Sequence, residues 1–217
     1  MINVILIAPP FAGKGTISEY LVKTLGYSHI STGDLLRNEI NKNSEIGKAV
    51  KNIMSQGKFV SDDIIFTVLE EELSDNKESL IFDGNPRNIK QAEMLLNLFK
   101  KKDITNYCVI TLDIKKEDLL KRVMGRRICP KCGRTYNLNY KEMLPLDGNL
   151  CIDCKMPLII RDDDNINTFN TRYQTYLDNT YPVIEYFQMN DVTVFEIDAS
   201  NDLAVIFEEV KKIVSDN

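Results

Sequence analysis

The chain has 217 residues, of which 43% are hydrophobic and 27% are charged, with a formal net charge of −5. These values are ordinary for a globular chain with a sizeable core, so they exclude a disordered or fibrous protein. The acidic balance argues against a protein that coats nucleic acid, although a local cluster of arginines could still bind a small anionic substrate. The longest apolar run, Val4–Ala8, is far shorter than the roughly 20 residues needed to span a bilayer. No signal peptide is recognisable, so we expect a chain that works in the cytoplasm and not in a membrane.

Short β-branched runs alternate with longer stretches of helical periodicity along the chain. Buried strands are predicted at residues 2–7, 80–82, 107–112 and 192–197. Helices are predicted at residues 16–25, 62–73, 88–99, 117–124, 165–187 and 203–214. This alternation predicts an α/β fold in which helices cover both faces of a parallel sheet.

Two segments break this rhythm and are predicted to be small insertions mounted on the sheet domain. Residues 31–60 carry short polar helices between the first two predicted strands. Residues 125–164 hold four cysteines and three prolines and have no long apolar run. The core domain is then expected to consist of the remaining segments, 1–30, 61–124 and 165–217.

The first predicted strand leads directly into the loop Ala8-Pro9-Pro10-Phe11-Ala12-Gly13-Lys14-Gly15-Thr16, and a helix follows. A strand, a tight loop and a helix N-terminus together present backbone N–H groups to a phosphate. Lys14 is predicted to reach the β- and γ-phosphates of a nucleotide, and Thr16 to face a magnesium ion. The general pattern has Gly in place of Ala8 and Ser or Thr in place of Gly15, so an ordinary strand-to-helix turn is the alternative.

A carboxylate and an arginine follow the second predicted strand, in the sequence Asp83-Gly84-Asn85-Pro86-Arg87. A carboxylate at the carboxyl end of a strand, beside a phosphate loop, is where Mg²⁺ or its water shell would be held. The planar guanidinium of Arg87 suits the oxygens of a phosphate.

Four of the five cysteines form two Cys-x-x-Cys pairs, Cys129/Cys132 and Cys151/Cys154, with the spacing of a zinc ribbon. No further ligand is evident, which predicts a structural zinc ion in a segment too small and too polar to have its own hydrophobic core. Unmetallated thiols are the alternative, while a redox role is disfavoured because neither pair opens a helix of a thioredoxin-like unit. Cys108 lies in an apolar run and is predicted to be a small buried hydrophobe.

Six short segments occur in an order and at separations typical of one enzyme family. They are Gly13-Lys14-Gly15-Thr16, Ser31-Thr32-Gly33-Asp34-Leu35-Leu36-Arg37, Asp83-Gly84-Asn85-Pro86-Arg87, Gly125-Arg126-Arg127, Arg161-Asp162-Asp163-Asp164-Asn165 and Arg172. With them, essentially the full chain resembles the adenylate kinases of the nucleoside-monophosphate kinase family, in the long form with a zinc-binding lid. The resemblance implies a mobile NMP-binding insertion at 31–60 and a mobile lid at 125–164. It also implies reversible phosphoryl transfer from MgATP to AMP, giving two ADP.

The resemblance further implies which residues hold the two nucleotides. The acceptor AMP would be bound by Thr32, Arg37, Lys58, Phe59, Val60, Gly84, Asn85, Pro86, Arg87, Gln91, Arg161 and Arg172. The donor ATP would be bound by Phe11, Ala12, Gly13, Lys14, Gly15, Thr16, Arg122, Arg126, Thr135 and Tyr136. The catalytic residues would be Lys14, Arg87 and Arg126, with Arg161 and Arg172 closing on the transferring group.

Individual roles follow from the same resemblance. Thr32 and Gln91 match positions that favour adenine in the acceptor. Arg122 would stack on the adenine of ATP, and Thr135 and Tyr136 would line the donor base. For the arginines, a solvated basic face is the alternative. Phosphoryl transfer needs positive charge around the phosphoryl oxygens more than acid–base groups, so the single histidine is predicted to be structural or solvent-facing.

The phosphate loop departs from the family pattern, because Ala8 and Phe11 stand where the family has glycine. A bulky residue forced into the left-handed region costs on the order of 1–2 kcal/mol. That is roughly tenfold if it all appears in nucleotide binding. Asn85 replaces a usual aromatic residue and Asn88 a usual threonine. These departures predict a working enzyme with reduced affinity for its donor.

Other classes of function stay open from the sequence alone. One is a nucleotide-binding pseudoenzyme, and another is an NMP kinase with a different donor, such as GTP, or a different acceptor. A third, a nucleic-acid binder built on the zinc ribbon, is disfavoured by the acidic charge and by the few aromatic residues near Arg126, Arg127, Lys131 and Arg134. We expect a monomer whose partners are ATP and AMP, and no nucleic acid.

Overall fold

The structure is a computed structural model that describes residues 1–55, 60–73, 79–146, 149–161 and 164–216. Its centre is a five-stranded parallel sheet in the order β2-β3-β1-β4-β7. The strands are β1 (Asn3–Ile7), β2 (Ser28–Ser31), β3 (Leu80–Asp83), β4 (Tyr107–Asp113) and β7 (Val194–Asp198). The predicted α/β class with a parallel sheet is therefore confirmed. Because β1 is central and pairs with β3 on one side and β4 on the other, the strand order changes direction at β1.

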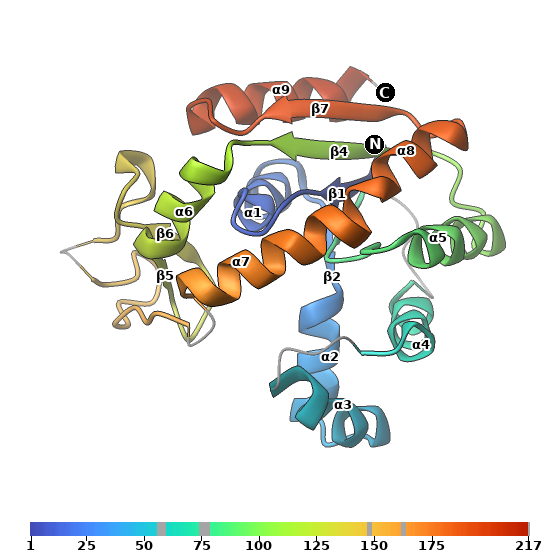
Figure 1. The fold of residues 1–217 in the computed structure, drawn as a ribbon, viewed down its shortest axis with the longest axis horizontal. Helices are drawn as coiled ribbons and strands as arrows, with labels where there is room; N and C mark the ends of the chain where they lie inside the picture. The colour runs from blue at the N-terminus through green and yellow to red at the C-terminus, as the bar shows by residue number, and fades with distance from the viewer. Residues whose placement is uncertain (56–59, 74–78, 147–148, 162–163, 217) are drawn as a thin grey trace.

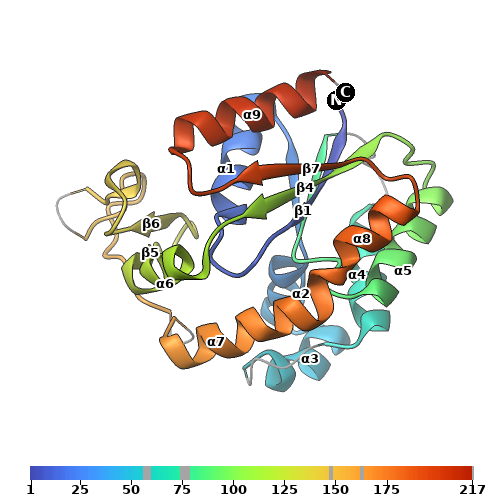
Figure 2. The ribbon, with the colours of Figure 1, turned by 45° about the horizontal axis from the view of Figure 1, so that its top comes forward.

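Helices cover both faces of the sheet (Figures 1 and 2). They are α1 (Lys14–Leu25), α2 (Thr32–Asn41), α3 (Glu45–Ser55), α4 (Asp62–Glu72), α5 (Ile89–Lys101), α6 (Lys116–Gly125), α7 (Ile166–Thr175), α8 (Pro182–Met189) and α9 (Leu203–Asp216). Short elements complete the chain: the antiparallel pair β5 (Arg126–Ile128) and β6 (Thr135–Asn137), the 3₁₀ turn η1 (Lys141–Met143) and the π-helical turn η2 (Tyr176–Thr180).

The side chains of the strands alternate between two hydrophobic clusters, as the two-residue period of a strand requires. Ile5 and Ile7 of β1 join a cluster with residues of α2, α3, α4, α5 and α8. Val4 and Leu6 face the opposite cluster, with residues of α1, α6, α7 and α9. The second cluster includes Cys108, which is fully buried in β4, and burial raises the pKa of its thiol to about 12. The prediction of a small buried hydrophobe at this position is confirmed.

Two predicted elements differ from the observed ones. Strand β2 was not predicted, because its sequence Ser-His-Ile-Ser has one buried apolar residue and lies at the edge of the sheet. The single helix predicted at 165–187 is divided into α7, η2 and α8. Pro182 has no N–H to continue a regular helix, and the chain widens before it, with the Tyr181 N–H bonded to the Tyr176 carbonyl at 2.8 Å.

The two segments expected to be insertions lie on different sides of the sheet. In Figure 1, α2 and α3 project below the sheet, while β5, β6 and the following turns lie to its left. The view in Figure 2 keeps them apart. No helix in the described ranges has the length and apolar character needed to cross a membrane.

Candidate active site

The loop between β1 and α1 lies at the carboxyl end of the central strand. In parallel α/β sheets, the change of strand order at this position creates the usual ligand crevice. Gly13 caps α1 in the left-handed region, with φ 112° and ψ 14°. No acidic residue occupies the first turn of α1, so the positive end of the helix dipole is left for an anion. The ammonium group of Lys14 folds back over the loop and donates to the Ala8 carbonyl at 3.0 Å.

Asp83 lies beside this loop because β1 and β3 are paired in register, with Leu6 opposite Asp83. Its carboxylate is 3.4 Å from Nε2 of His29. Burial raises the pKa of Asp83, but the hydrogen bond from His29 and the positive charges nearby outweigh it and hold the pKa below its ordinary value. Asp83 therefore stays ionised, as a group that holds Mg²⁺ or its water shell must be.

The pairing of His29 is a feature that the sequence analysis missed. In the β2–β3 register Ser31 lies opposite Asp83, and His29 is two positions earlier on the same face of the strand. The contact could have been found only if β2 had been recognised as the neighbour of β3. His29 is thus a structural partner of the carboxylate at the end of β3.

Positive charge converges on Lys14 from segments far apart in the sequence. Burial lowers the pKa of Lys14 below its ordinary value, and the carboxylate of Asp83 opposes that shift. Three nearby guanidinium groups add to the lowering, those of Arg87, Arg172 and Arg126. The pKa of Arg87 is likewise lowered. The larger cause is loss of solvation of its guanidinium group, and the positive charge of Arg172 is the next. Such a group of cations suits a ligand with several negative charges.

Phe11 lies against two of these cations, Arg126 and Arg172. Its φ of 68° is in the left-handed region, which costs a bulky residue on the order of 1–2 kcal/mol. The guanidinium carbon of Arg126 lies 4.4 Å from the centroid of the Phe11 ring, and that of Arg172 lies 5.3 Å from it. Each cation–π contact is worth about 0.5–2 kcal/mol, so the two together are comparable with the backbone strain.

Arg126 begins β5, directly after α6, and is held by Asp164 from the other end of the same insertion. Its Nε donates to Asp164 Oδ2 at 2.7 Å, and a second N–H donates to Oδ1. The Asp164 side chain is fully buried and that of Arg126 is 16% exposed, so this is a desolvated, two-pronged pair. Asp164 was predicted only as a member of a motif, since a pairing across 38 residues leaves no local signal.

Arg122 joins three segments around the phosphate loop. One N–H group donates to the Ala12 carbonyl and another to the Ala199 carbonyl, both at 2.6 Å. Its guanidinium carbon also lies 5.1 Å from the centroid of the Tyr140 ring. Ala199 and Tyr140 were not anticipated, and they surround the residue that the resemblance places on the donor base.

Thr135 and Tyr136, also expected at the donor base, lie on β6, where successive side chains point to opposite faces. The Tyr136 ring is 3% exposed and its hydroxyl donates to Cys151 Sγ at 3.3 Å, so the ring packs into the cysteine cluster. Thr135 is half-buried. A role of these two residues at the donor base stays a prediction.

On the acceptor side, Gln91 is the centre of a buried polar network. Its Nε2 donates to Asp62 Oδ1 at 2.8 Å, while its Oε1 accepts from Arg87 N at 2.7 Å and from Asn85 Nδ2 at 3.1 Å. Thr32 Oγ1 and Asn85 Oδ1 are buried without a hydrogen-bond partner in the described part of the chain.

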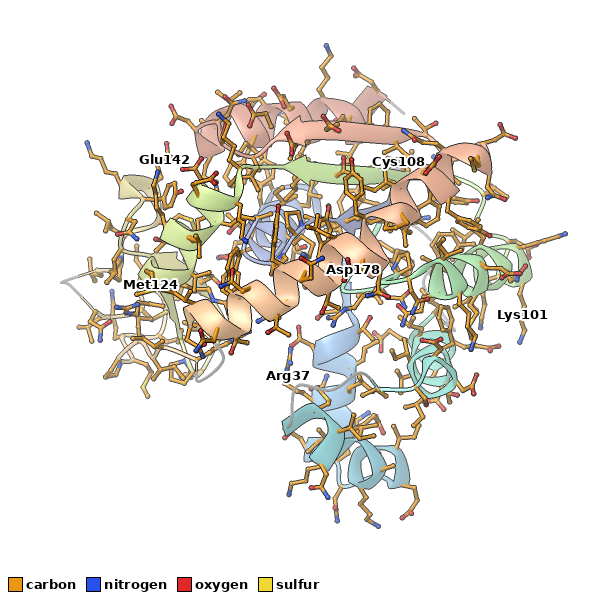
Figure 3. All side chains as sticks on the ribbon, viewed as in Figure 1. Arg37, Lys101, Cys108, Met124, Glu142 and Asp178 are labelled. Carbon is orange, nitrogen blue, oxygen red and sulfur yellow. The ribbon has the colours of Figure 1, made fainter. Side chains whose placement is uncertain are left out.

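The other predicted acceptor residues are placed as follows. Arg87 Nε donates to the Gly84 carbonyl at 2.8 Å, and Gly84 has a φ of 82°. Arg37, labelled on α2 in Figure 3, pairs with Asp34 at 2.5 Å. Pro86 and Val60 are buried. Arg161 is exposed, and its carbonyl accepts from Asp164 N at 3.0 Å. The expected residues Lys58 and Phe59 lie outside the described residues.

The four remaining cysteines converge at the other end of the molecule. The sulfur atoms of Cys129, Cys132, Cys151 and Cys154 all lie within 4.8 Å of one another, and those of Cys132 and Cys151 are 3.7 Å apart. Tetrahedral Zn–S bonds of about 2.3 Å would place sulfurs about 3.8 Å apart, so this donor set fits a zinc ion. The cluster is compatible with the predicted structural zinc site.

The two Cys-x-x-Cys turns have the same backbone form. The N–H of Gly133 donates to the Cys129 carbonyl and that of Lys155 to the Cys151 carbonyl, both at 2.9 Å. Each donor residue is left-handed, with φ of 76° and 56° respectively. Burial raises the pKa of Cys151, but hydrogen bonds from the Tyr136 hydroxyl and the N–H groups of neighbouring residues lower it to about 6. Cys151 therefore favours the thiolate, the form that binds a metal, while burial raises the pKa of Cys132 and a hydrogen bond with Cys132 raises that of Cys154.

At the switch point of the parallel sheet, a strand is followed by a glycine-containing loop and a helix, and basic residues surround the loop. This arrangement defines a protein that binds nucleoside phosphates through a P-loop. Comparison with known proteins makes the class more specific. The sequence profile of the family "Adenylate kinase" matches residues 6–192.

Curated relatives match nearly end to end. The adenylate kinase of Thermosipho melanesiensis is 38% identical over 214 residues, which cover 98% of this chain and 99% of the relative. That of Kosmotoga olearia is 39% identical, covering 97% of each chain, and that of Thermotoga maritima is 37% identical, covering 99% of this chain and 97% of the relative. The chain therefore belongs to the adenylate kinase family.

Proposed function

We propose that this protein catalyses the reversible transfer of the γ-phosphoryl group of MgATP to AMP, giving two ADP. The observation that carries the proposal is the convergence of Lys14, Arg87, Arg126 and Arg172 on the loop after the central strand. Phosphoryl transfer asks a protein chiefly for positioning and for positive charge around the phosphoryl oxygens, with little acid–base work. Family membership, with similarity over nearly the whole chain, supports the same reaction.

On the donor side, backbone N–H groups from Phe11 to Thr16 would bind the phosphates at the start of α1. Lys14 would release the Ala8 carbonyl and bind the β- and γ-phosphates instead. Arg126 would contact the phosphates with the donors that Asp164 leaves unused, and Arg122 would lie against the base, with Thr135 and Tyr136 on the lid side of it.

On the acceptor side, Arg37 and Arg87 would bind the α-phosphate of AMP. Thr32, Val60 and Gln91 would surround its base, together with Lys58, Phe59, Gly84, Asn85 and Pro86. Arg161 and Arg172 would close on the transferring group from the lid side. Thr32 Oγ1 and Asn85 Oδ1, which lack partners in the described structure, are groups that a bound nucleotide could satisfy after a small rearrangement.

Two mobile parts would hold the substrates and exclude water during transfer. We propose residues 31–60 as the NMP-binding insertion and residues 125–164 as the lid, on a core of 1–30, 61–124 and 165–217. Their closure would bring the arginines of α6, α7 and the lid onto the phosphates and prevent loss of the phosphoryl group to water.

Two metal ions complete the proposal. Mg²⁺ bound with ATP would neutralise charge on the phosphates, and Asp83 and Thr16 would hold it or its water shell. Zn²⁺ would be held by Cys129, Cys132, Cys151 and Cys154, and its role would be to fix the lid. We further propose a cytoplasmic monomer that acts on free nucleotides, with no nucleic acid or membrane partner.

The test is ADP production from MgATP with AMP, CMP, UMP and GMP as acceptors, and with GTP as a second donor for AMP. Turnover with ATP and AMP at the highest rate is expected, with about one zinc ion per chain in the same sample. Arg87→Met should abolish most of that turnover, while Arg127→Met, at a half-buried arginine to which we assign no nucleotide contact, serves as the control. Folded, zinc-loaded protein that turns over no acceptor would contradict the proposal and favour the pseudoenzyme.

A further inference from the structure

Phe11 connects the phosphate loop to two arginines that arrive from different elements. Arg126 starts the lid after α6, and Arg172 lies on α7, which leads back from the lid to the core. Both guanidinium carbons lie over the Phe11 ring, at 4.4 and 5.3 Å from its centroid. One side chain of the loop therefore touches both chain segments on which the lid is mounted.

The ring is held in place from behind by α7. The centroid of Phe169 lies 5.9 Å from that of Phe11, and Phe169 is fully buried. Phe169 and Arg172 are three residues apart and so share one side of the helix. Tyr173 extends the contact, with its ring stacked 5.6 Å from that of Phe169. The position of Phe11 is thus fixed by packing and does not depend on the arginines alone.

The contact brings together cations that would otherwise repel each other. Arg126 and Arg172 both disfavour the charged form of Lys14, so all three lie within electrostatic reach of one another. The negative face of an aromatic ring attracts a guanidinium group without occupying its N–H donors. Arg126 illustrates this, because it gives two donors to Asp164 while it lies over Phe11. The ring can therefore hold arginines that must later bind phosphate.

We propose that Phe11 is a positioning residue that sets Arg126 and Arg172 beside the phosphate loop before the donor nucleotide binds. The proposal rests on the proposed function and adds a role for the side chain of Phe11: its ring acts on the transfer step through the two arginines. Its backbone conformation and bulk act separately, on the affinity of the loop for phosphate. The two effects therefore divide between kcat and the KM for ATP.

Three substitutions at this position separate the ring from its bulk. Phe11→Tyr keeps the ring, Phe11→Leu keeps an apolar side chain with the same left-handed backbone, and Phe11→Gly removes both the ring and the strain. With AMP saturating, we expect kcat to stay within about threefold of wild type for Phe11→Tyr and to fall about tenfold for Phe11→Leu. For Phe11→Gly we expect the same fall in kcat together with a lower KM for ATP.

A spectroscopic measurement tests the contact itself without turnover. In the nucleotide-free protein, the Cδ protons of Arg126 and Arg172 should show upfield ring-current shifts in the NMR spectrum. These shifts should persist in Phe11→Tyr and disappear in Phe11→Leu. Thermal unfolding of each variant shows whether it is folded, and Phe11→Gly provides the ring-free comparison if the leucine variant is unstable.

The outcomes distinguish this proposal from the proposed function. An active wild type with an unchanged kcat in Phe11→Leu and Phe11→Gly would overturn the positioning role alone. Equal losses in Phe11→Tyr and Phe11→Leu would overturn it as well, because the ring would not be the group that matters. A folded, zinc-loaded wild type without turnover would overturn the proposed function, and the role of Phe11 in transfer with it.

Discussion

The two segments mounted on the sheet are stabilised by different interactions. On the acceptor side, Leu36, Val50 and Val60 belong to the same hydrophobic cluster as strands β1 and β3 and helices α5 and α8. In the lid, the buried cluster is separate from both main clusters and consists of Cys129, Tyr136, Cys151 and Leu158. The acceptor segment is therefore an extension of the core, whereas the proposed lid has a small cluster of its own, in which two of the four buried residues are cysteines.

Contacts at the boundary of each segment follow the same division. The lid meets the core through polar groups. Arg134 lies 3.5 Å from Glu19 of α1. Glu142, labelled in Figure 3, accepts from the N–H of Leu203 at the start of α9 at 3.1 Å. Polar contacts exchange readily with water, whereas buried apolar contacts do not. If a metal keeps the lid folded, as proposed above, exchangeable contacts are enough to attach it to the core.

Removing the metal should have the largest effect and should be confined to the lid. Structural zinc in small domains provides apparent free energies of about 10–16 kcal/mol, and the lid cluster offers little to replace it. After chelation, or in a Cys129→Ser/Cys151→Ser variant, we expect proteolytic cleavage within the lid and loss of turnover. The main unfolding transition should remain near its original temperature in calorimetry.

Cys108→Ala is the matched control, because it removes a cysteine from the core and should leave the metal content unchanged. A lid that resists protease equally well with and without metal would contradict the proposed difference in how the two segments are stabilised. It would mean that the lid is stabilised in the same way as the acceptor segment.

The next largest effect should come from Leu36→Ala on the acceptor side. Leu36 is 4% exposed and packs within the main cluster, so its truncation should lower the free energy of unfolding of the whole protein by about 2–5 kcal/mol. Denaturant unfolding followed by circular dichroism measures this value. Leu144→Ala, at a half-exposed lid position, should change it little. A loss limited to hydrogen-exchange protection of α2 would contradict the continuity of the acceptor segment with the core.

Tyr136→Phe should weaken the metal site by a smaller amount. The Tyr136 hydroxyl donates to Cys151 Sγ and accepts from Ile152 N at 2.8 Å, so it orients one ligand and satisfies a backbone N–H. Loss of such a supporting group costs about 10- to 100-fold in metal affinity. Competition with a chromogenic chelator measures the affinity. Tyr140→Phe, which keeps the ring beside Arg122, is the control, and equal affinities in the two variants would count against a supporting role of Tyr136.

Glu19→Gln should have the smallest effect. It removes the partner of Arg134 across the boundary of the lid, and exposed ion pairs are worth at most about 1 kcal/mol. Hydrogen exchange of β6 should increase slightly at low salt and match wild type at high salt, because salt screens the pair. Glu45→Gln, which removes the same charge from the Glu45–Lys48 ion pair of α3, provides the charge control. A large increase that is independent of salt would show that the boundary is not held by exchangeable polar contacts.

The sequence was sufficient for the parts of the fold that have a periodic signal. Strands β1, β3, β4 and β7 are nearly continuous apolar runs, and the alternation with helices predicted their parallel arrangement correctly. Strand β2 is short and polar and owes its place to pairing with β3, which is a tertiary effect. The π-helical turn was also invisible, since its apolar spacing resembles that of a regular helix.

In the site, residues within one motif were predictable and contacts between motifs were not. The loop position of Phe11 predicted a left-handed backbone, and the structure has it, with φ of 68°. The ring contacts of Phe11 with Arg126 and Arg172 span more than 100 residues and leave no mark in the sequence. The same is true of the pairing of Arg126 with Asp164.

The buried cysteine of β4 has a practical consequence for work in solution. Cys108 has no accessible surface, and its thiol has a pKa of about 12, so it is unreactive toward thiol reagents while the protein is folded. The other four thiols lie together in the proposed lid, where Cys132 is exposed and Cys154 is partly exposed, so a bound metal would protect them. A simple colorimetric titration with a thiol reagent therefore serves as a gauge of metal occupancy in the native chain, with no label introduced.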